Sequence, residues 1–140
     1  MTSHADTPEA QATDLSMLLR WRLQNDGSLS GMLVATNNAD RRVRITGKPR
    51  LIALGVDGRE LDADMIVSAD LRIPDFVELG PGEQAQAAVS WAGWDGPASS
   101  GQVVVELPGG RVQATVLGPP QPNTRGPATN LSSSWFSRPN

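Results

Sequence analysis

The chain has 140 residues, a length that fits one domain, and its 39% hydrophobic content is enough for one core. Fourteen glycines and 11 prolines divide it into the short pieces that are typical of an all-β fold. The net charge of −3 argues against binding nucleic acid through a basic surface, and the absence of cysteine excludes disulfides, thiolate catalysis and Cys-ligated metal centres.

In chain order, the first predicted element follows a polar, flexible N-terminal tail of residues 1–13. Apolar and polar residues then alternate from Leu15 to Leu23, which predicts a half-buried strand. Turn residues end this strand at Asn25-Asp26-Gly27-Ser28. Further strands are expected over residues 29–36, 42–46 and 50–56, the last closed by Asp57-Gly58.

The second half of the chain continues the pattern after a less regular stretch. Strands are expected over residues 76–79, 84–91, 102–107 and 111–117, and Pro108-Gly109-Gly110 predicts a hairpin between the last two. Seven to eight short strands over residues 14–117, with turns about every 8–12 residues, predict an immunoglobulin-like antiparallel β-sandwich.

Residues 118–140 differ in composition and form a Pro/Ser-rich C-terminal tail, which we expect to be disordered or extended. The tail contains Leu131, Trp135 and Phe136 in an otherwise polar segment. These side chains are candidates for an anchor that docks on a partner, on the domain itself or on a neighbouring copy. A plain disordered end is the alternative interpretation.

The central part of the sequence resembles an actinobacterial family of domains of unknown function that occurs in lipoproteins and envelope proteins. The pattern has an Asn-containing turn, a Gly-x-Pro, a strand closed by Asp-Gly, a Leu-x-Pro-Gly and a strand ending in Trp. The matching residues are Asn37, Gly47, Pro49, Asp57, Gly58, Leu79, Pro81, Gly82 and Trp91. The resemblance implies an immunoglobulin-like sandwich at the cell envelope, without an established activity and without functional residues to transfer.

The chain departs from this family where many members carry a cysteine pair, because Val43 lies in the corresponding neighbourhood and no cysteine is present. No stretch is long enough to span a membrane, and residues 1–14 have no signal-peptide pattern. We therefore expect an extracytoplasmic, envelope-associated protein whose export signal is absent or removed. A cytoplasmic location is the alternative.

Catalytic residues are not apparent, and neither enzyme activity nor a cofactor is predicted. His4, the only histidine, lies in the N-terminal tail, where it is not held near a nucleophile. Carboxylates follow one turn at Asp57, Glu60, Asp62 and Asp64. Calcium prefers such oxygen ligands, but the spacing is not that of a calcium loop, so Asp57, Asp62 and Asp64 are only a weak candidate metal site beside the alternative of solvated carboxylates.

Besides the tail residues, candidate partner-binding residues lie at two places. Five cations without an intervening acid make up what we call the basic strip, namely Arg41, Arg42, Arg44, Lys48 and Arg50. Trp94 lies in a loop, where it either contacts a partner or folds back over the core, whereas Trp21 and Trp91 are expected inside the core. A solvated sheet face is the alternative for the strip.

The sequence has candidate partner-binding residues and no apparent catalytic residues, which predicts a non-enzymatic interaction module. Its expected partner is a protein, which it would bind through the basic strip, Trp94 and the tail residues Leu131, Trp135 and Phe136. The alternative is a domain that binds a carbohydrate or an anionic lipid headgroup through Trp94 and the strip. Nucleic acid is not expected, because no aromatic residues interleave the cations.

Overall fold

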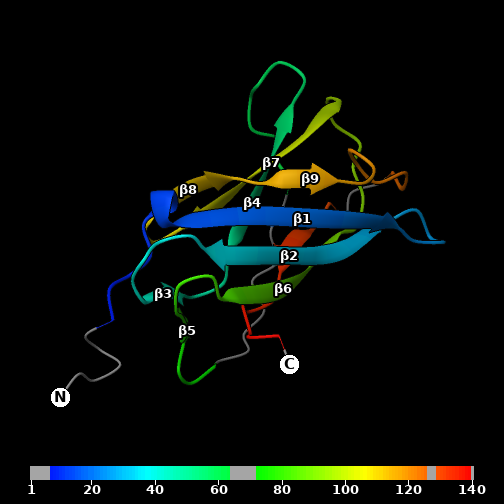
Figure 1. Cartoon of the computed structure of the whole chain (residues 1–140). Helices are drawn as coiled ribbons and strands as arrows, with labels where there is room; N and C mark the ends of the chain where they lie inside the picture. The colour runs from blue at the N-terminus through cyan, green and yellow to red at the C-terminus, as the bar shows by residue number, and fades with distance from the viewer. Residues whose placement is uncertain (1–6, 64–71, 126–128, 140) are drawn as a thin grey trace.

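The computed structural model describes residues 7–63, 72–125 and 129–139, and in this part of the chain it is all-β apart from one short 3-10 helix, η2 (Ala12–Asp14) (Figure 1). Ten strands follow one another: β1 (Leu15–Leu23), β2 (Leu29–Asn37), β3 (Val43–Thr46), β4 (Arg50–Gly55), β5 (Phe76–Leu79), β6 (Gln84–Trp91), β7 (Ser99–Leu107), β8 (Gly110–Gln113), β9 (Thr115–Leu117) and β10 (Leu131–Ser133). The predicted all-β sandwich class is confirmed, with ten strands where seven to eight were expected. The described residues form no helix that is long and apolar enough to cross a membrane.

The main layer is a five-stranded sheet with the order β10-β6-β2-β1-β9. Strands β9, β1, β2 and β6 lie side by side at the front of the view in Figure 1. Neighbouring strands are antiparallel except β1 and β9, which are parallel. The register pairs Leu19 with Leu33 and Leu33 with Ala87, so that one row of buried side chains crosses three strands.

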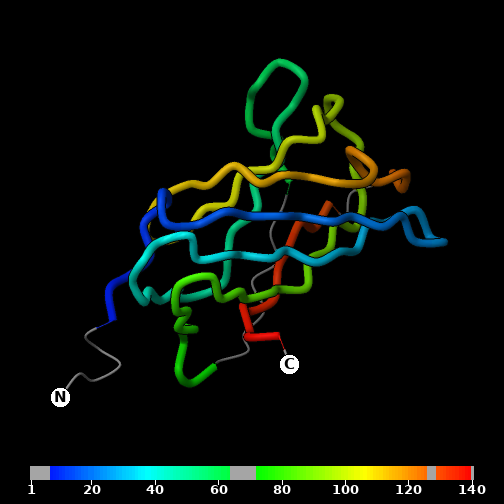
Figure 2. Tube along the Cα trace, viewed as in Figure 1, coloured from blue at the N-terminus to red at the C-terminus, as the bar shows by residue number. Residues whose placement is uncertain are grey.

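The opposite layer consists of a three-stranded sheet, β4-β7-β8, and the small pair β3-β5. The predicted hairpin is present, since β7 and β8 pair antiparallel. Its second strand does not stay with β7, however. At Ala114 the chain passes in one continuous run from β8 into β9, which pairs with β1 of the other sheet (Figure 2). The two layers are thus joined covalently along one side.

The core follows from the alternation of apolar residues in both layers. Strand β1 buries every second side chain from Leu15 to Trp21, and β7 does the same with Val103, Val105 and Leu107. Trp21 and Trp91 are both buried, as predicted. Because each large apolar side chain contributes about 1.5–3 kcal/mol when it is buried, this alternation is the main stabilising pattern of the fold.

Packed structure extends beyond the predicted limits of 14–117 at both ends. Near the N-terminus, Glu9 forms a parallel bridge with Arg44 of β3, and Ala10 is buried. Near the C-terminus, β10 adds an antiparallel strand to the edge of β6. Of the two expectations for the tail, disordered or extended, Leu131–Ser133 follows the second, because β6 offers this short strand an unpaired backbone edge and an apolar site.

Candidate interaction surface

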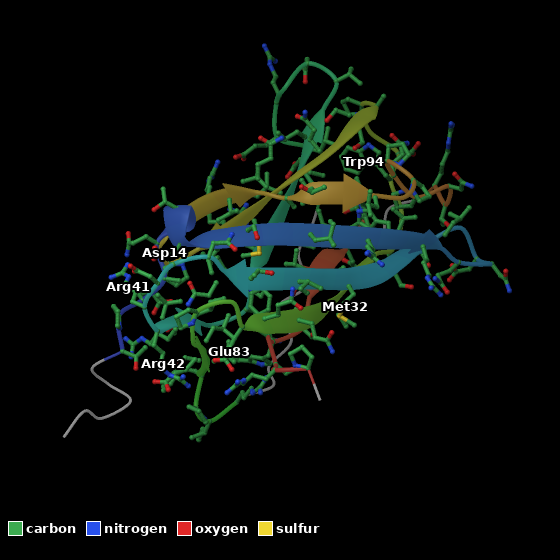
Figure 3. The ribbon with its side chains drawn as sticks, viewed as in Figure 1. Asp14, Met32, Arg41, Arg42, Glu83 and Trp94 are labelled. Atoms are coloured by element: carbon green, nitrogen blue, oxygen red, sulfur yellow. The ribbon has the colours of Figure 1, made fainter. Side chains whose placement is uncertain are left out.

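The basic strip of the sequence is matched by acids that the fold brings beside it. Arg41 Nη2 lies 2.9 Å from Asp14 Oδ2, and Arg42 Nε lies 3.3 Å from Glu78 Oε2 with Glu83 also nearby (Figure 3). The Gln11 N–H, together with the Arg41 guanidinium, lowers the pKa of Asp14 below its usual range. These arginines therefore already have anionic partners within the domain.

The rest of the strip is also engaged. Arg44 Nε lies 3.2 Å from Glu9 Oε1, and Arg50 Nη1 lies 3.3 Å from Glu106 Oε1. The Lys48 ammonium is 5.5 Å from the centre of the Trp135 ring, a distance at which a cation is attracted to the ring face. The strip is thus a set of intramolecular contacts rather than an uncompensated basic patch.

Trp94 folds back over the core, which is the second of its two predicted placements. Its side chain is only 5% exposed, and its ring centre lies 5.8 Å from that of Trp91 at a tilt of 54°. The indole N–H donates to the Pro97 carbonyl at 2.6 Å. Gly96 allows this fold, because a Cβ there would lie 2.5 Å from the Trp94 ring. No exposed aromatic platform remains at this loop.

The apolar residues of the tail dock on the domain itself, one of the alternatives left open by the sequence. Leu131 and Phe136 are 2% and 3% exposed and belong to the core. Backbone bonds continue past β10, since Ser134 N–H donates to Ala88 and Ser137 exchanges two bonds with Gln86. Trp135 is half-buried beneath Lys48. These side chains hold the segment on β6 and present little surface to a partner.

The candidate metal site lies only partly within the described part of the chain. Asp57 Oδ1 accepts the Arg59 N–H at 3.0 Å inside the turn, and Glu60 pairs with Arg111 at 2.7 Å. Asp62 is exposed, and Asp64 lies outside the described residues, as does His4. No group of three His, Cys, Asp or Glu side chains that could hold a metal ion occurs among the residues described.

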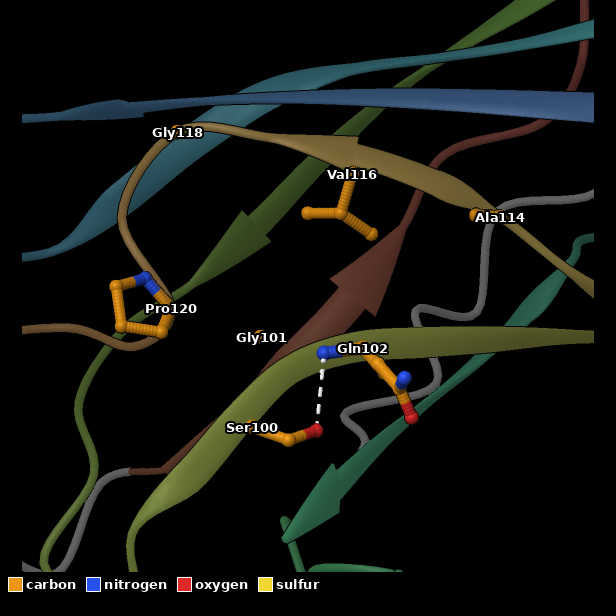
Figure 4. A pocket seen from close by; sticks show the side chains of 7 residues that line it. All are labelled: Ser100, Gly101, Gln102, Ala114, Val116, Gly118 and Pro120. Carbon is orange, nitrogen blue, oxygen red and sulfur yellow. Dashed lines mark hydrogen bonds between the residues drawn. The ribbon is translucent and has the colours of Figure 1, made fainter. Parts of the chain in front are cut away.

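A shallow pocket of about 320 Å³ opens at the seam between β7 and β9 (Figure 4). Its lining residues are small or neutral: Ser100, Gly101, Gln102, Ala114, Val116, Gly118 and Pro120. The Ser100 hydroxyl accepts the Gln102 N–H at 3.1 Å and donates to the Leu54 carbonyl at 3.0 Å. This pocket contains no titratable side chain, so it has no residue for acid–base chemistry.

A different surface emerges on the solvent side of the five-stranded sheet, which we call the outer face. It is formed by the residues that alternate with the core positions, namely Ser16, Leu18, Arg20, Arg22, Ser30, Met32, Val34, Thr36, Gln84, Gln86, Ala88, Ser90, Thr115 and Leu117. No described segment crosses this face in front of β9, β1, β2 and β6 (Figure 1). It is therefore an open sheet face.

The register places apolar side chains and one cation in a single row across this face. Leu117 lies beside Arg20, Arg20 beside Met32, and Met32 beside Ala88. We call these four residues the central row. Leu117 is 49% exposed and Met32 is 36% exposed, two of the large apolar side chains that the described structure leaves in solvent. Met32 can be seen on the front of the sheet in Figure 3.

The charge of the outer face has one sign. Arg20 and Arg22 are exposed and form no ion pair in the part of the chain that is described, in contrast to the basic strip. No outward position of β1, β2, β6 or β9 carries an acid. The outer face thus combines two uncompensated guanidinium groups with exposed apolar contacts.

Sequence reasoning missed this surface although part of its signal was present. The alternation of β1 correctly places Arg20 and Arg22 opposite the core. Leu18 and Met32 occupy the same polar side as these arginines, which is unusual for a face that is only solvated. The adjacency of Leu117 to Arg20 depends on the parallel pairing of β9, which no local pattern indicates.

Comparison with known families gives one match. The family model described as domain of unknown function (DUF4232) matches residues 11–134. No curated protein and no solved structure matches the chain significantly. Residues that carry the sequence resemblance have structural roles here: Asn37 is fully buried, and its amide group donates to the carbonyls of Arg41 and Leu79 at 2.8 and 3.0 Å.

Proposed function

Since the chain belongs to the family described as domain of unknown function (DUF4232), its role has to be inferred from its own surface, and we propose that it is a non-enzymatic interaction module that binds a protein partner through the outer face. The carrying observation is the central row, in which Arg20 lies between the exposed side chains of Leu117 and Met32. Exposed apolar residues grouped on an open face are typical of contact surfaces.

The composition of the outer face supports a protein partner in particular. Arg and Met are enriched at protein interfaces, where the centre is apolar and the rim is polar. Here Ser30 and Ser90 border the row on one side. On the other side Thr115 and Gln86 lie at the two ends, and the apolar Leu18 and Val34 lie between them. The carbohydrate alternative was based on an exposed Trp94, and the burial of that ring leaves it without its main support.

The cellular setting is a further part of the proposal and rests on the family resemblance alone. We propose an extracytoplasmic, envelope-associated accessory protein with an immunoglobulin-like fold. On the envelope side of a membrane, an open sheet face on a small domain suits attachment to a larger assembly, because it needs neither a cofactor nor a movable segment.

Site-directed photo-crosslinking in cells that naturally make the protein tests this function. A photoreactive phenylalanine at Thr115, beside the central row, should give a discrete protein adduct. The same group at Val56, which is 75% exposed in the turn after β4, is the matched control and should not give that adduct. The adduct should also disappear when Met32→Asp is added. Equal adducts from both positions, or none from Thr115, would overturn the proposal.

A further inference from the structure

We propose that the partner of the outer face is an acidic protein surface, which presents carboxylates to Arg20 and Arg22 around an apolar contact with Met32 and Leu117. This inference rests on the proposed function and specifies its partner. It follows from the charge of the face, because both arginines lack an anionic partner within the described chain and no acid occupies an outward position of β1, β2, β6 or β9.

The geometry of the two arginines suits carboxylates. Arg20 and Arg22 are two residues apart on β1, so their side chains leave the same face of the sheet about 7 Å apart. A guanidinium binds a carboxylate with two parallel hydrogen bonds, a fit that a lysine ammonium does not provide. Leu117 and Met32 flank Arg20 on both sides, and an apolar partner surface over them would remove water from the ion pair and strengthen it.

A second copy of the chain does not fit as the occupant. Two identical faces packed against each other around a twofold axis would bring together four arginines and no acid, and like charges in an interface are repulsive. The partner must therefore carry the opposite charge. The outer face discriminates between partners by this charge.

Anionic membranes and nucleic acids fit less well than an acidic protein. Each cation near an anionic membrane contributes about 1 kcal/mol, so two arginines give only weak attachment, whereas lipid-binding clusters usually contain about 4–8 cations. Two phosphate contacts without aromatic stacking are likewise too few for nucleic acid. A protein surface gains from both components of the face, the two cations and the apolar side chains.

The size of the face predicts a weak, reversible complex. The five strands contain nine, nine, eight, three and three residues. At about 3.3 Å per residue along a strand and about 4.8 Å between strands, they give a flat area of about 500 Å², below the roughly 800 Å² per partner of a standard interface. In such a complex the charges determine the association rate and the sensitivity to salt.

Titration of the full-length, ¹⁵N-labelled protein with a synthetic peptide tests the inference. The probe is Ac-Glu-Leu-Asp-Leu-Glu-NH₂, and its control has Gln and Asn in place of the acids. We expect chemical-shift changes at the amides of the central row with the acidic peptide only. Arg20→Gln should weaken this binding about tenfold, whereas Arg20→Lys should retain part of it and Arg59→Gln, the same charge change at a remote exposed turn, should have no effect.

Four outcomes would overturn the inference. Equal shifts at the central row with acidic and neutral peptides would show an outer-face site that does not select acids, and the proposed function would survive through its crosslinking test. Chemical-shift changes confined to another surface, or no changes with either peptide, would show that the outer face does not bind an acidic partner. Arg20-dependent binding to phosphatidylserine vesicles, with no response to the acidic peptide, would identify a lipid surface in its place.

Discussion

The carboxylate of Glu9 holds the N-terminal segment against β3. It accepts the backbone N–H of Thr46 at 2.8 Å and the Thr46 hydroxyl at 2.6 Å, and it lies 3.2 Å from Arg44 Nε. The next residue, Ala10, is buried and donates its N–H to the Arg44 carbonyl at 2.8 Å. One charged side chain in a segment predicted to be flexible thus orders the approach to β1.

Replacing this carboxylate should destabilise the domain measurably. Glu9→Ala removes three acceptor contacts, and the half-buried Thr46 N–H loses its partner, so we expect a loss of about 1–3 kcal/mol in the free energy of unfolding. Glu60→Ala is the matched control, because Glu60 is exposed in its pair with Arg111 and should cost below about 1 kcal/mol. Urea unfolding followed by tryptophan fluorescence compares the two, and equal effects would contradict the role of Glu9.

At the scale of elements, β10 shows how a polar segment can complete a sheet. The connection from β9 to β10 joins opposite edges of the same five-stranded sheet. Leu131 pairs with Trp91, and the Ala92 N–H donates to the Asn130 carbonyl at 3.1 Å. The added strand pairs with residues 89–91 of β6, and Ser134 and Ser137 bond to Ala88 and Gln86 of the same edge, so little of the β6 edge stays uncovered. An uncovered strand edge is a site of aggregation.

Truncation of the Leu131 side chain tests whether β10 is an integral strand. Leu131→Ala leaves a cavity at a site that is 2% exposed, and we expect a loss of about 2–5 kcal/mol in stability together with faster exchange of the β6 edge amides. Ser132→Ala, on the outward side of the same strand, should change stability by no more than about 0.5 kcal/mol. Chemical denaturation measures the stability of the two variants, and hydrogen exchange measures the opening of the β6 edge. Equal small effects would mean that the strand is dispensable.

Local patterns predicted the long strands well and the added ones poorly. The alternation from Leu15 to Leu23 gives β1 with the same bounds, and the predicted strand over 76–79 is β5. Strand β10 has only three residues, two of them serine, and its partner Trp91 lies 40 residues earlier, so no local period marks it. The passage from β8 to β9 is also invisible, because both strands continue one alternating run.

At the scale of the whole molecule, the distribution of charge depends on tertiary structure. The sequence clusters five cations between residues 41 and 50, but their acids come from places as distant as Glu9 and Glu106. Arg20 and Arg22 are only two cations within one strand, yet they have no ion pair in the described structure. The candidate surface could therefore not be chosen from charge clusters, because folding decides which cations remain uncompensated.

The same ion pairs predict how stability depends on pH. Hydrogen bonds from Arg111 and Arg50 lower the pKa of Glu106, and the Gln11 N–H and Arg41 lower the pKa of Asp14. A carboxyl group whose pKa is lower in the folded state than in the unfolded state binds its proton more readily after unfolding. Its stabilising contribution is therefore complete above the unfolded pKa and is lost as the pH falls through the folded one.

We accordingly expect the unfolding temperature to fall when the pH is lowered from about 6 to about 3, since the ordinary pKa values of Asp and Glu are about 4. The double variant Asp14→Asn, Glu106→Gln should be less stable at pH 6 and should lose less stability on acidification. The test compares the slope of unfolding temperature against pH in the two proteins. The other carboxylates titrate in both, so a difference in slope comes from the two that are replaced. Calorimetric scans at several pH values in this range measure the unfolding temperature of both proteins. Parallel slopes would show that the two ion pairs do not contribute to the pH dependence of stability. High salt should reduce the difference between the proteins, as both carboxylates lie near the surface.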